Sequence, residues 1–239
     1  MNVNRWLVPA LFFGSLWVVD WSIGGEFRDP RGPQSQAEGE RPAAAPLRPA
    51  DSDSPFPEGW PDATLPGRIE VKNYPAYRSA EAQAKGASLR SDGILFFSLF
   101  NHISQSKIEM TAPVVNTYLT PEMIETPRAT GDMTMEFLYR SLNQGEVGKG
   151  VGAVKVKDHP AQTFVCLGLV GEMDPQVMRE GVRKLREWLQ EHKAEWVEAG
   201  PVRRLGYHGP MTPSSQRRWE IQIPIRPMKP QDSGTSTTP

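Results

Sequence analysis

An internal repeat limits the folds that this chain can adopt. Residues 71–76 read VKNYPA and residues 156–161 read VKDHPA. Each segment begins like a strand, reaches a proline and continues as a second extended run. The match is short, so its meaning depends on whether the same structural elements follow both copies.

The same order of elements does follow each copy. Helical patterns appear at 89–103 and at 174–196, where Asp174 is a predicted N-cap and Pro175 occupies the first helical position. Two extended runs come after each helix: 107–119 and 133–141 in the first half, 202–209 and 217–225 in the second. We therefore predict an α+β fold, a distorted antiparallel β-barrel built from two βαββ repeats with two packed helices.

The N-terminal sequence predicts a membrane segment. Residues 1–25 contain the cation Arg5 followed by the apolar run WLVPALFFGSLWVV at 6–19. This pattern is typical of a secretory signal or a signal anchor. We favour an uncleaved transmembrane anchor, because no clear small-residue cleavage site follows, and a cleaved signal is the alternative. Both interpretations place the domain on the periplasmic or extracellular side of a membrane.

Composition separates a folded region from its flanks. Residues 26–66 are rich in proline and polar residues, and their few apolar side chains predict a disordered linker. The same argument predicts a disordered tail at 227–239. Residues 67–226 remain as one domain, which is long enough to bury a core.

Charge and motifs argue against several functions. Lys+Arg 27 against Asp+Glu 28 gives a net charge of −1, so a nucleic-acid partner is not expected. The single cysteine, Cys166, lies in the apolar run TFVCLGLVG and is predicted to be a buried thiol. There is no Gly-x-Ser-x-Gly elbow, phosphate-binding loop or metal-spaced histidine pair. We therefore do not expect an enzyme.

Three segments resemble the SOUL haem-binding protein family. They are IEVKNYPAY (69–77), GILFFSLFNHI (93–103) and, most specifically, KIEMTAPV (107–114). A segment very like Lys-Ile-x-Met-Thr-x-Pro-Val follows the first helix in that family. The strand RRWEIQI (217–223) is also similar, although the family commonly has Asn-Glu where this chain has Trp219-Glu220.

This resemblance covers nearly all of 67–226 and implies both a fold and a ligand. The family fold is a distorted barrel of two βαββ halves, shared with effector-binding domains of the gyrase-inhibitor type. The family is associated with binding haem or other tetrapyrroles, without covalent attachment, in an apolar groove by the first helix. The expected function is thus that of a reversible, non-catalytic haem carrier or buffer.

The first helix and the segment after it supply the candidate cofactor-binding residues. Haem needs apolar area for the macrocycle, cations for the propionates and, optionally, an axial ligand. The candidates are Leu95, Phe96, Leu99, Phe100, His102, Ile103, Lys107 and Met110. Helical geometry divides the apolar ones between the sheet and the groove.

His102 is the candidate ligand for the haem iron. Two other roles remain open for it: filling the space of an aromatic residue that family members commonly carry there, or bonding the last carbonyls of the helix. Met110 is a second conceivable ligand, although a methionine inside a strand is more often a core residue. Lys107 is a candidate partner for a propionate.

Two other functions remain open. The first is a small-molecule effector-binding module with a non-porphyrin ligand, in a cleft lined by Trp219, Tyr207, Glu136 or Glu220. The second is a structural or protein-interaction domain whose groove binds no ligand.

Overall fold

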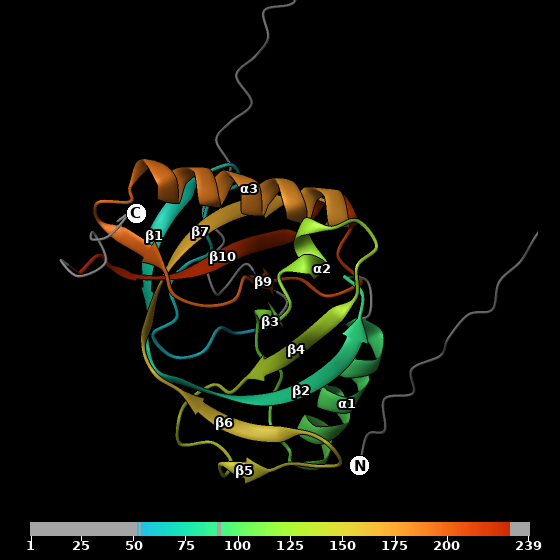
Figure 1. The fold of residues 1–239 in the computed structure, drawn as a ribbon. Helices are drawn as coiled ribbons and strands as arrows, with labels where there is room; N and C mark the ends of the chain where they lie inside the picture. Colours follow the sequence, from blue (N-terminus) through green and yellow to red (C-terminus); the bar gives the residue numbers. More distant parts are fainter. Residues whose placement is uncertain (1–51, 53, 90–91, 230–239) are drawn as a thin grey trace, which may run out of the picture. The chain divides into compact units, whose positions relative to one another are not determined.

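The structure, a computed structural model, describes residues 52, 54–89 and 92–229 (Figure 1). The predicted anchor at 1–25, most of the predicted linker and most of the predicted tail lie outside these residues. In the part that is described, no helix is long and apolar enough to cross a bilayer. The elements are β1 (Ile69–Tyr74), β2 (Tyr77–Ala87), α1 (Asp92–Gln105), β3 (Val114–Tyr118), α2 (Glu122–Glu125), β4 (Gly131–Leu138), β5 (Gly148–Lys149), β6 (Lys155–His159), β7 (Gln162–Val170), α3 (Pro175–Glu191), β8 (Trp196–Glu198), β9 (Arg203–Gly206), the 3-10 turn η2 (Ser214–Gln216) and β10 (Arg218–Pro227).

The order of the strands reproduces the internal repeat. The sheet runs β1-β7-β10-β9-β3-β4-β2-β6-β5, and β8 pairs with β10 outside this path. β9 and β3 meet at the centre, and equivalent strands follow outward on both sides. β1 pairs with β7 of the second half, and β6 pairs with β2 of the first half. The two βαββ halves therefore exchange their first strands, which are the VKNYPA and VKDHPA segments.

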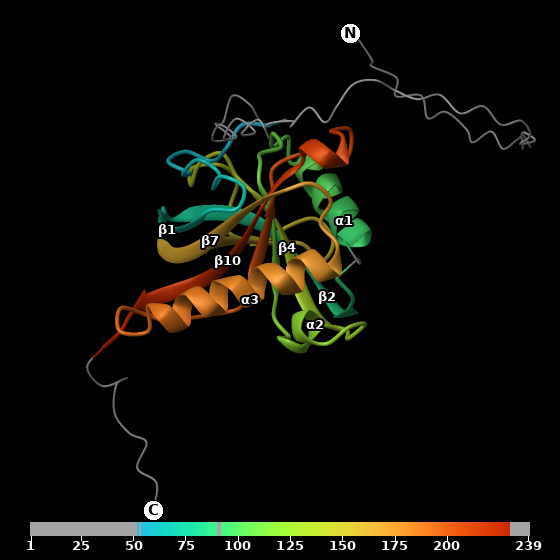
Figure 2. The ribbon, with the colours of Figure 1, turned by 90° about the horizontal axis from the view of Figure 1, so that it is seen from above.

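The predicted α+β fold of two βαββ repeats is confirmed, with one qualification about closure. All the strand pairs are antiparallel, but the order ends at β1 and β5 without joining them. The sheet is thus an open, distorted barrel. α1 packs against β2 and β4, and α3 packs against β7 and β10 (Figure 2). Each half therefore covers its own strands with its own helix.

Strand alternation gives the sheet two different faces. On the face beneath the helices, β4 contributes Met133, Met135 and Phe137, and β10 contributes Ile221 and Ile223. The opposite face lines the barrel interior and holds a second cluster, rich in aromatic residues, whose largest members are Phe56, Trp60, Tyr74, Tyr77, Phe164 and Tyr207.

Residues 54–66 belong with the domain, although composition assigned them to the linker. Phe56 and Trp60 are buried in the interior cluster, where the Trp60 ring packs edge-on against Tyr74 and Tyr77. Gly168 lacks a side chain where the carbonyl oxygens of this segment approach the sheet. Aromatic side chains bury a large apolar area, so Phe56 and Trp60 can fix this proline-rich segment on the domain although it forms no helix or strand.

The segment KIEMTAPV begins its strand later than the sequence pattern suggested. Residues 107–113 form no strand, and β3 starts at Val114. Thr111 Oγ1 donates a hydrogen bond to the Leu138 carbonyl at 2.6 Å, and the Ala112 amide donates to Pro55. These contacts fix an irregular segment beside the sheet, whose Ile108 and Met110 pack against the core cluster beneath the helices while Ala112 belongs to the interior cluster.

Candidate functional site

A groove beside α1 is the first candidate site. It has a volume of about 270 Å³ and lies between α1, the KIEMTAPV segment and the connection from β9 to β10. Its apolar lining includes Phe96, Met110, Ala112, Val114 and Trp219. Small-molecule sites in proteins usually span about 300–1,000 Å³. A groove just below that range encloses only part of a macrocycle, so the remainder would lie against the surface around it.

Helical periodicity explains which candidate residues reach this groove. Leu95, Leu99 and Ile103 follow the i, i+4 stripe that packs on the sheet, and all three are buried in the core. Phe96 lies at one edge of that stripe. Its ring packs against Phe137 at 5.0 Å and is stacked on Phe100 at 6.2 Å between centroids.

Only some of the eight predicted residues therefore come together at the groove. Phe96 and Met110 line it, whereas Phe100, which is half-exposed and stacked on Phe96, is not part of the lining. Lys107 is exposed after the end of α1 and is not part of the lining. The three core residues support the helix from beneath, so they act on the groove only through the position of Phe96.

His102 lies on the other flank of α1, where both of its ring nitrogens are engaged. Nε2 is 2.8 Å from the Tyr139 hydroxyl, and Nδ1 accepts a hydrogen bond from the Val151 amide at 3.2 Å. Burial lowers the pKa of His102 and favours the neutral ring. Iron ligation through either nitrogen would displace the hydrogen bond that this nitrogen makes, so the geometry favours the space-filling role.

The groove has a second wall, in which Tyr207 and Trp219 were expected from the sequence as residues of a cleft but three other residues were not. Arg204, Gly206 and His208 line it from β9 and the turn that follows. Nδ1 of His208 accepts a hydrogen bond from the Arg218 amide at 3.0 Å, and the Arg204 guanidinium lies 5.5 Å from the Trp219 ring. These residues are about 100 positions from α1 in sequence. Only the central β3–β9 pairing brings them beside it.

The barrel interior contains a second, more polar cleft. It has a volume of about 350 Å³ and is lined by residues of both halves, among them Tyr77, Glu136, His159 and Arg203. Glu136 Oε2 accepts a hydrogen bond from Ser79 at 2.9 Å and lies 3.3 Å from His159 Nε2. The His159 ring is stacked on Tyr77 at 4.5 Å between centroids.

A buried chain of hydrogen bonds joins this cleft to the buried Glu220 of the second half. Arg203 donates to the Tyr77 hydroxyl at 3.1 Å and to Gln222 at 2.8 Å. Gln222 donates in turn to Tyr74 and to Glu220. Glu136 and Glu220 occupy equivalent positions of the repeat, since each pairs with a residue of its half's second strand and with one of its third.

The two equivalent carboxylates differ in their surroundings. Burial opposes ionisation of Glu220, but Lys72 at 3.0 Å, the Thr64 amide and Gln222 outweigh it and hold the pKa of Glu220 below its usual value. Glu220 is thus a closed structural ion-pair site. Glu136 lines the open cleft instead, where a ligand can reach the lining residues around the carboxylate, such as His159 and Arg203.

The Ser79, His159 and Glu136 side chains do not form a nucleophilic triad. Ser79 Oγ and the Glu136 carboxylate both approach the same ring nitrogen, Nε2 of His159. In a triad, the acid holds the opposite nitrogen and leaves Nε2 for the hydroxyl. Ser79 is also fully buried. The three side chains therefore hold one another in place through hydrogen bonds, and their geometry does not support covalent catalysis.

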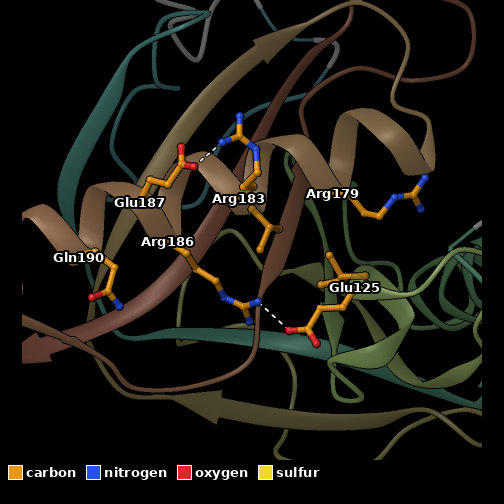
Figure 3. A pocket seen from close by; sticks show the side chains of 8 residues that line it. Glu125, Arg179, Arg183, Arg186, Glu187 and Gln190 are labelled. Carbon is orange, nitrogen blue, oxygen red and sulfur yellow. Dashed lines mark hydrogen bonds and ion pairs between the residues drawn. The ribbon is translucent and has the colours of Figure 1, made fainter.

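A shallow surface depression between α2 and α3 is lined by several arginines. Its volume is about 390 Å³, and Figure 3 shows Arg179, Arg183 and Arg186 along its rim. Arg183 pairs with Glu180 and Glu187 of its own helix, and Arg186 pairs with Glu125 of α2 at 2.7 Å. Neighbouring carboxylates balance most of this positive charge, so the depression is a weak candidate for an anion site.

The described residues contain no group of three or more His, Cys, Asp or Glu side chains placed to hold a metal ion. Cys166 is buried, and burial raises the pKa of its thiol well above the ordinary value. Among the described residues, the α1 groove and the interior cleft are the concave sites whose linings best suit a ligand.

Fold and site define a duplicated βαββ domain with an open antiparallel sheet and a groove beside its first helix. The family model described as SOUL heme-binding protein matches residues 63–224. The chain belongs to the SOUL heme-binding protein family, because this match covers more than half of its length. No curated protein matches the chain significantly.

Two solved structures share the fold of this domain at low sequence identity. The EcmrR C-terminal domain is 17% identical with a TM-score of 0.55, covering 67% of this chain and 98% of that one. An uncharacterized conserved protein from Listeria innocua is 12% identical with a TM-score of 0.50, covering 67% and 93%. The TM-scores show a shared fold, and at these low sequence identities the similarity says nothing about a shared ligand.

Proposed function

We propose that this protein binds haem or a related tetrapyrrole reversibly in the α1 groove, as a carrier or buffer without catalysis. The observation that carries the proposal is the groove itself, in a chain of the SOUL heme-binding protein family. Its apolar wall from Phe96 to Trp219 offers a flat ring system a surface to stack on. The Arg204 guanidinium in the same wall offers positive charge to a carboxylate.

The groove's own residues support partial burial of such a ligand. The half-exposed Phe100 ring is stacked on Phe96 outside the lining, so the part of the macrocycle that the groove does not enclose would lie near Phe100 and solvent. Binding of this kind exchanges ligand more readily than a closed cavity does, which suits a carrier. Met110 contributes a thioether to the lining of the groove, and His102 is not required as an iron ligand in this proposal.

The test is a titration of the purified chain with hemin, followed by the Soret absorption band. We expect a saturable change with one hemin per chain at micromolar protein. An absorbance that rises linearly, as for hemin in buffer alone, would remove the proposal. Apomyoglobin serves as a positive control and a protein of similar size without a haem site serves as a negative control.

A second candidate function follows from the interior cleft. Glu136 and Arg203 place opposite charges in a concave site of about 350 Å³, so a polar non-porphyrin ligand fits its chemistry. A thermal-shift screen that includes hemin separates the two functions. A polar hit whose shift disappears in Glu136→Gln, with no response to hemin, would favour an effector-binding module.

We also propose that the domain is held outside the cytoplasm by an N-terminal membrane anchor. The support is the sequence of residues 1–25, in which Arg5 precedes an apolar run. Mass spectrometry of the mature protein decides the matter: an anchor leaves Met1 to Gly25 in place, whereas a cleaved signal removes most of them.

A further inference from the structure

The second half of the domain carries a peptide segment of its own chain. Residues 54–66 form no helix and no named strand, and charged side chains hold their backbone. Nζ of Lys72 donates a hydrogen bond to the Asp62 carbonyl at 2.6 Å, and the Thr64 amide donates to the Glu220 carboxylate. Because these bonds involve main-chain groups, the surface beneath the segment has the chemistry of a peptide-binding site.

The internal repeat shows where the equivalent surface lies in the first half. Lys157 stands at the position of Lys72, and His159 stands at the position of Tyr74. β6 pairs with β2 in the register in which β1 pairs with β7, so the positions of β2 and β7 correspond as well. The two surfaces can therefore be compared residue by residue.

The residues that contact the segment have counterparts in the lining of the interior cleft. In the second half, four positions lie against residues 54–66: Gly168, Lys72, Tyr74 and Pro75. In the first half, their counterparts all line the cleft: Gln83, Lys157, His159 and Pro160. The cleft, with its open volume of about 350 Å³, is thus the first-half counterpart of a surface that the chain covers with a peptide.

The charged group at the mouth of the cleft is accessible. Lys157 pairs with Glu81, and its side chain is 44% exposed, whereas that of Lys72 is 10% exposed. An ammonium group has three donors, and Lys72 uses them for a carboxylate and a main-chain carbonyl at once. Lys157 can likewise keep Glu81 and bind a carbonyl oxygen of a ligand.

Two other lining residues define how a peptide would lie in the cleft. A Cβ at Gly168 would lie 2.3 Å from two carbonyl oxygens of the bound segment, so glycine permits that close contact. Gln83 takes this place in the cleft, so a peptide there would lie further from the strand. The Gln83 amide can donate to a peptide carbonyl and accept from a peptide amide. Leu119, which is 44% exposed in the lining, offers an apolar contact.

We propose that the interior cleft binds a peptide segment of another protein, held through its main chain by Lys157 and Gln83 and through an apolar side chain by Leu119. Main-chain hydrogen bonds supply affinity in such sites, and contacts to side chains supply specificity. A second copy does not supply the segment, because aromatic side chains bury residues 54–66 in the copy's own domain. The proposal specifies the ligand of the second candidate function and rests on that use of the cleft, not on hemin binding.

The probe is the synthetic peptide EGWPDATLP, residues 58–66 of this chain, labelled with fluorescein. Its binding to the purified full chain is followed by fluorescence anisotropy, and the all-D peptide of the same sequence is the control for non-specific adhesion. Lys157→Ala removes the expected donor to the peptide carbonyl. Lys184→Ala is the matched control, because it removes an exposed lysine of α3.

We expect saturable binding of one peptide per chain. Lys157→Ala should weaken it about tenfold, as the loss of a hydrogen bond from a charged donor implies, while Lys184→Ala stays within about twofold. Absence of saturation, equal binding of the all-D peptide or equal weakening by both substitutions overturns the proposal. If the peptide fails to bind, the thermal-shift screen still tests a small polar ligand of the cleft.

A photo-reactive benzoylphenylalanine in place of Trp60 of the peptide locates the bound probe. We expect cross-links, identified by mass spectrometry, to Leu119 or to residues 199–201 in the lining of the cleft. Cross-links to Phe164 and Tyr74 would overturn the proposal, because the peptide would then have replaced the chain's own segment. Saturating hemin should leave the peptide affinity unchanged, since the α1 groove and the cleft share no lining residue. Competition by hemin would place the peptide in the α1 groove and overturn the proposal as well.

Discussion

Replacing Phe96 by alanine should weaken hemin binding between about tenfold and about fiftyfold. A Phe side chain has roughly 150–250 Å² of surface. If the macrocycle covers about a quarter of it, and loses a similar area of its own, roughly 100 Å² leaves water on binding. At about 25 cal/mol per Å² this corresponds to about 2.5 kcal/mol, of which the alanine Cβ retains a part.

The neighbouring residue provides the control for this prediction. Phe97 has the same side chain on the same helix but points to solvent and does not line the groove. Phe97→Ala should therefore leave hemin affinity within about twofold of the original value. Phe96 also packs on Phe137, so thermal unfolding of both variants has to show that each remains folded at the temperature of the titration.

The assay is the Soret titration, with dissociation constants for the original chain and the two variants. An affinity of Phe96→Ala within twofold of the original would show that the ligand does not stack in the groove. Equal weakening by both substitutions would place the ligand on the exposed side of α1 instead. Either result would refute the reasoning that assigns the ligand to the groove.

Three further predictions concern ligation, reactivity and the N-terminal segment. His102→Ala should leave the hemin spectrum unchanged but lower stability by about 1–3 kcal/mol, since it orphans Tyr139 and the Val151 amide. Because the pKa of His102 is lowered, its contribution to stability is present above about pH 6.5 and is lost as the pH falls below it, which pH-dependent unfolding of both proteins would reveal. Cys166 should react with a thiol reagent only in denaturant, and rapid labelling of the native chain would contradict its burial. Gly168→Ala should cost about 1–3 kcal/mol, because a Cβ there would lie 2.3 Å from the carbonyl oxygens of the 54–66 segment, whereas Gly93→Ala, with open space around it, should not destabilise the domain.

Local patterns in the sequence were sufficient for the architecture. The repeat at 71–76 and 156–161 predicted two βαββ halves, and Asp174 caps α3 as expected by accepting hydrogen bonds from the Gln176 and Val177 amides. The N-cap and the helical period depend on neighbours within a few residues, so the sequence alone contains them. KIEMTAPV likewise identified the family, which the match over 63–224 confirmed.

The candidate site depended on contacts between distant segments. Sequence periodicity could not decide which side of α1 faces a groove, because that depends on where the sheet lies. Only the β3–β9 pairing brings Arg204 and His208 beside Phe96. The sequence also could not show that His102 is engaged on the far flank of α1, or that Phe56 and Trp60 draw a proline-rich segment into the core.

The sequence by itself thus determined the two halves, their helices and the family, because these follow from short-range patterns in the chain. The tertiary structure decided which side chains share a cavity, since the halves exchange their first strands and join at their centre. That exchange places the two equivalent glutamates in one interior network and leaves the outer face of α1 uncovered by the rest of the described domain. Such long-range placement depends on packing, and no local pattern in the chain encodes it.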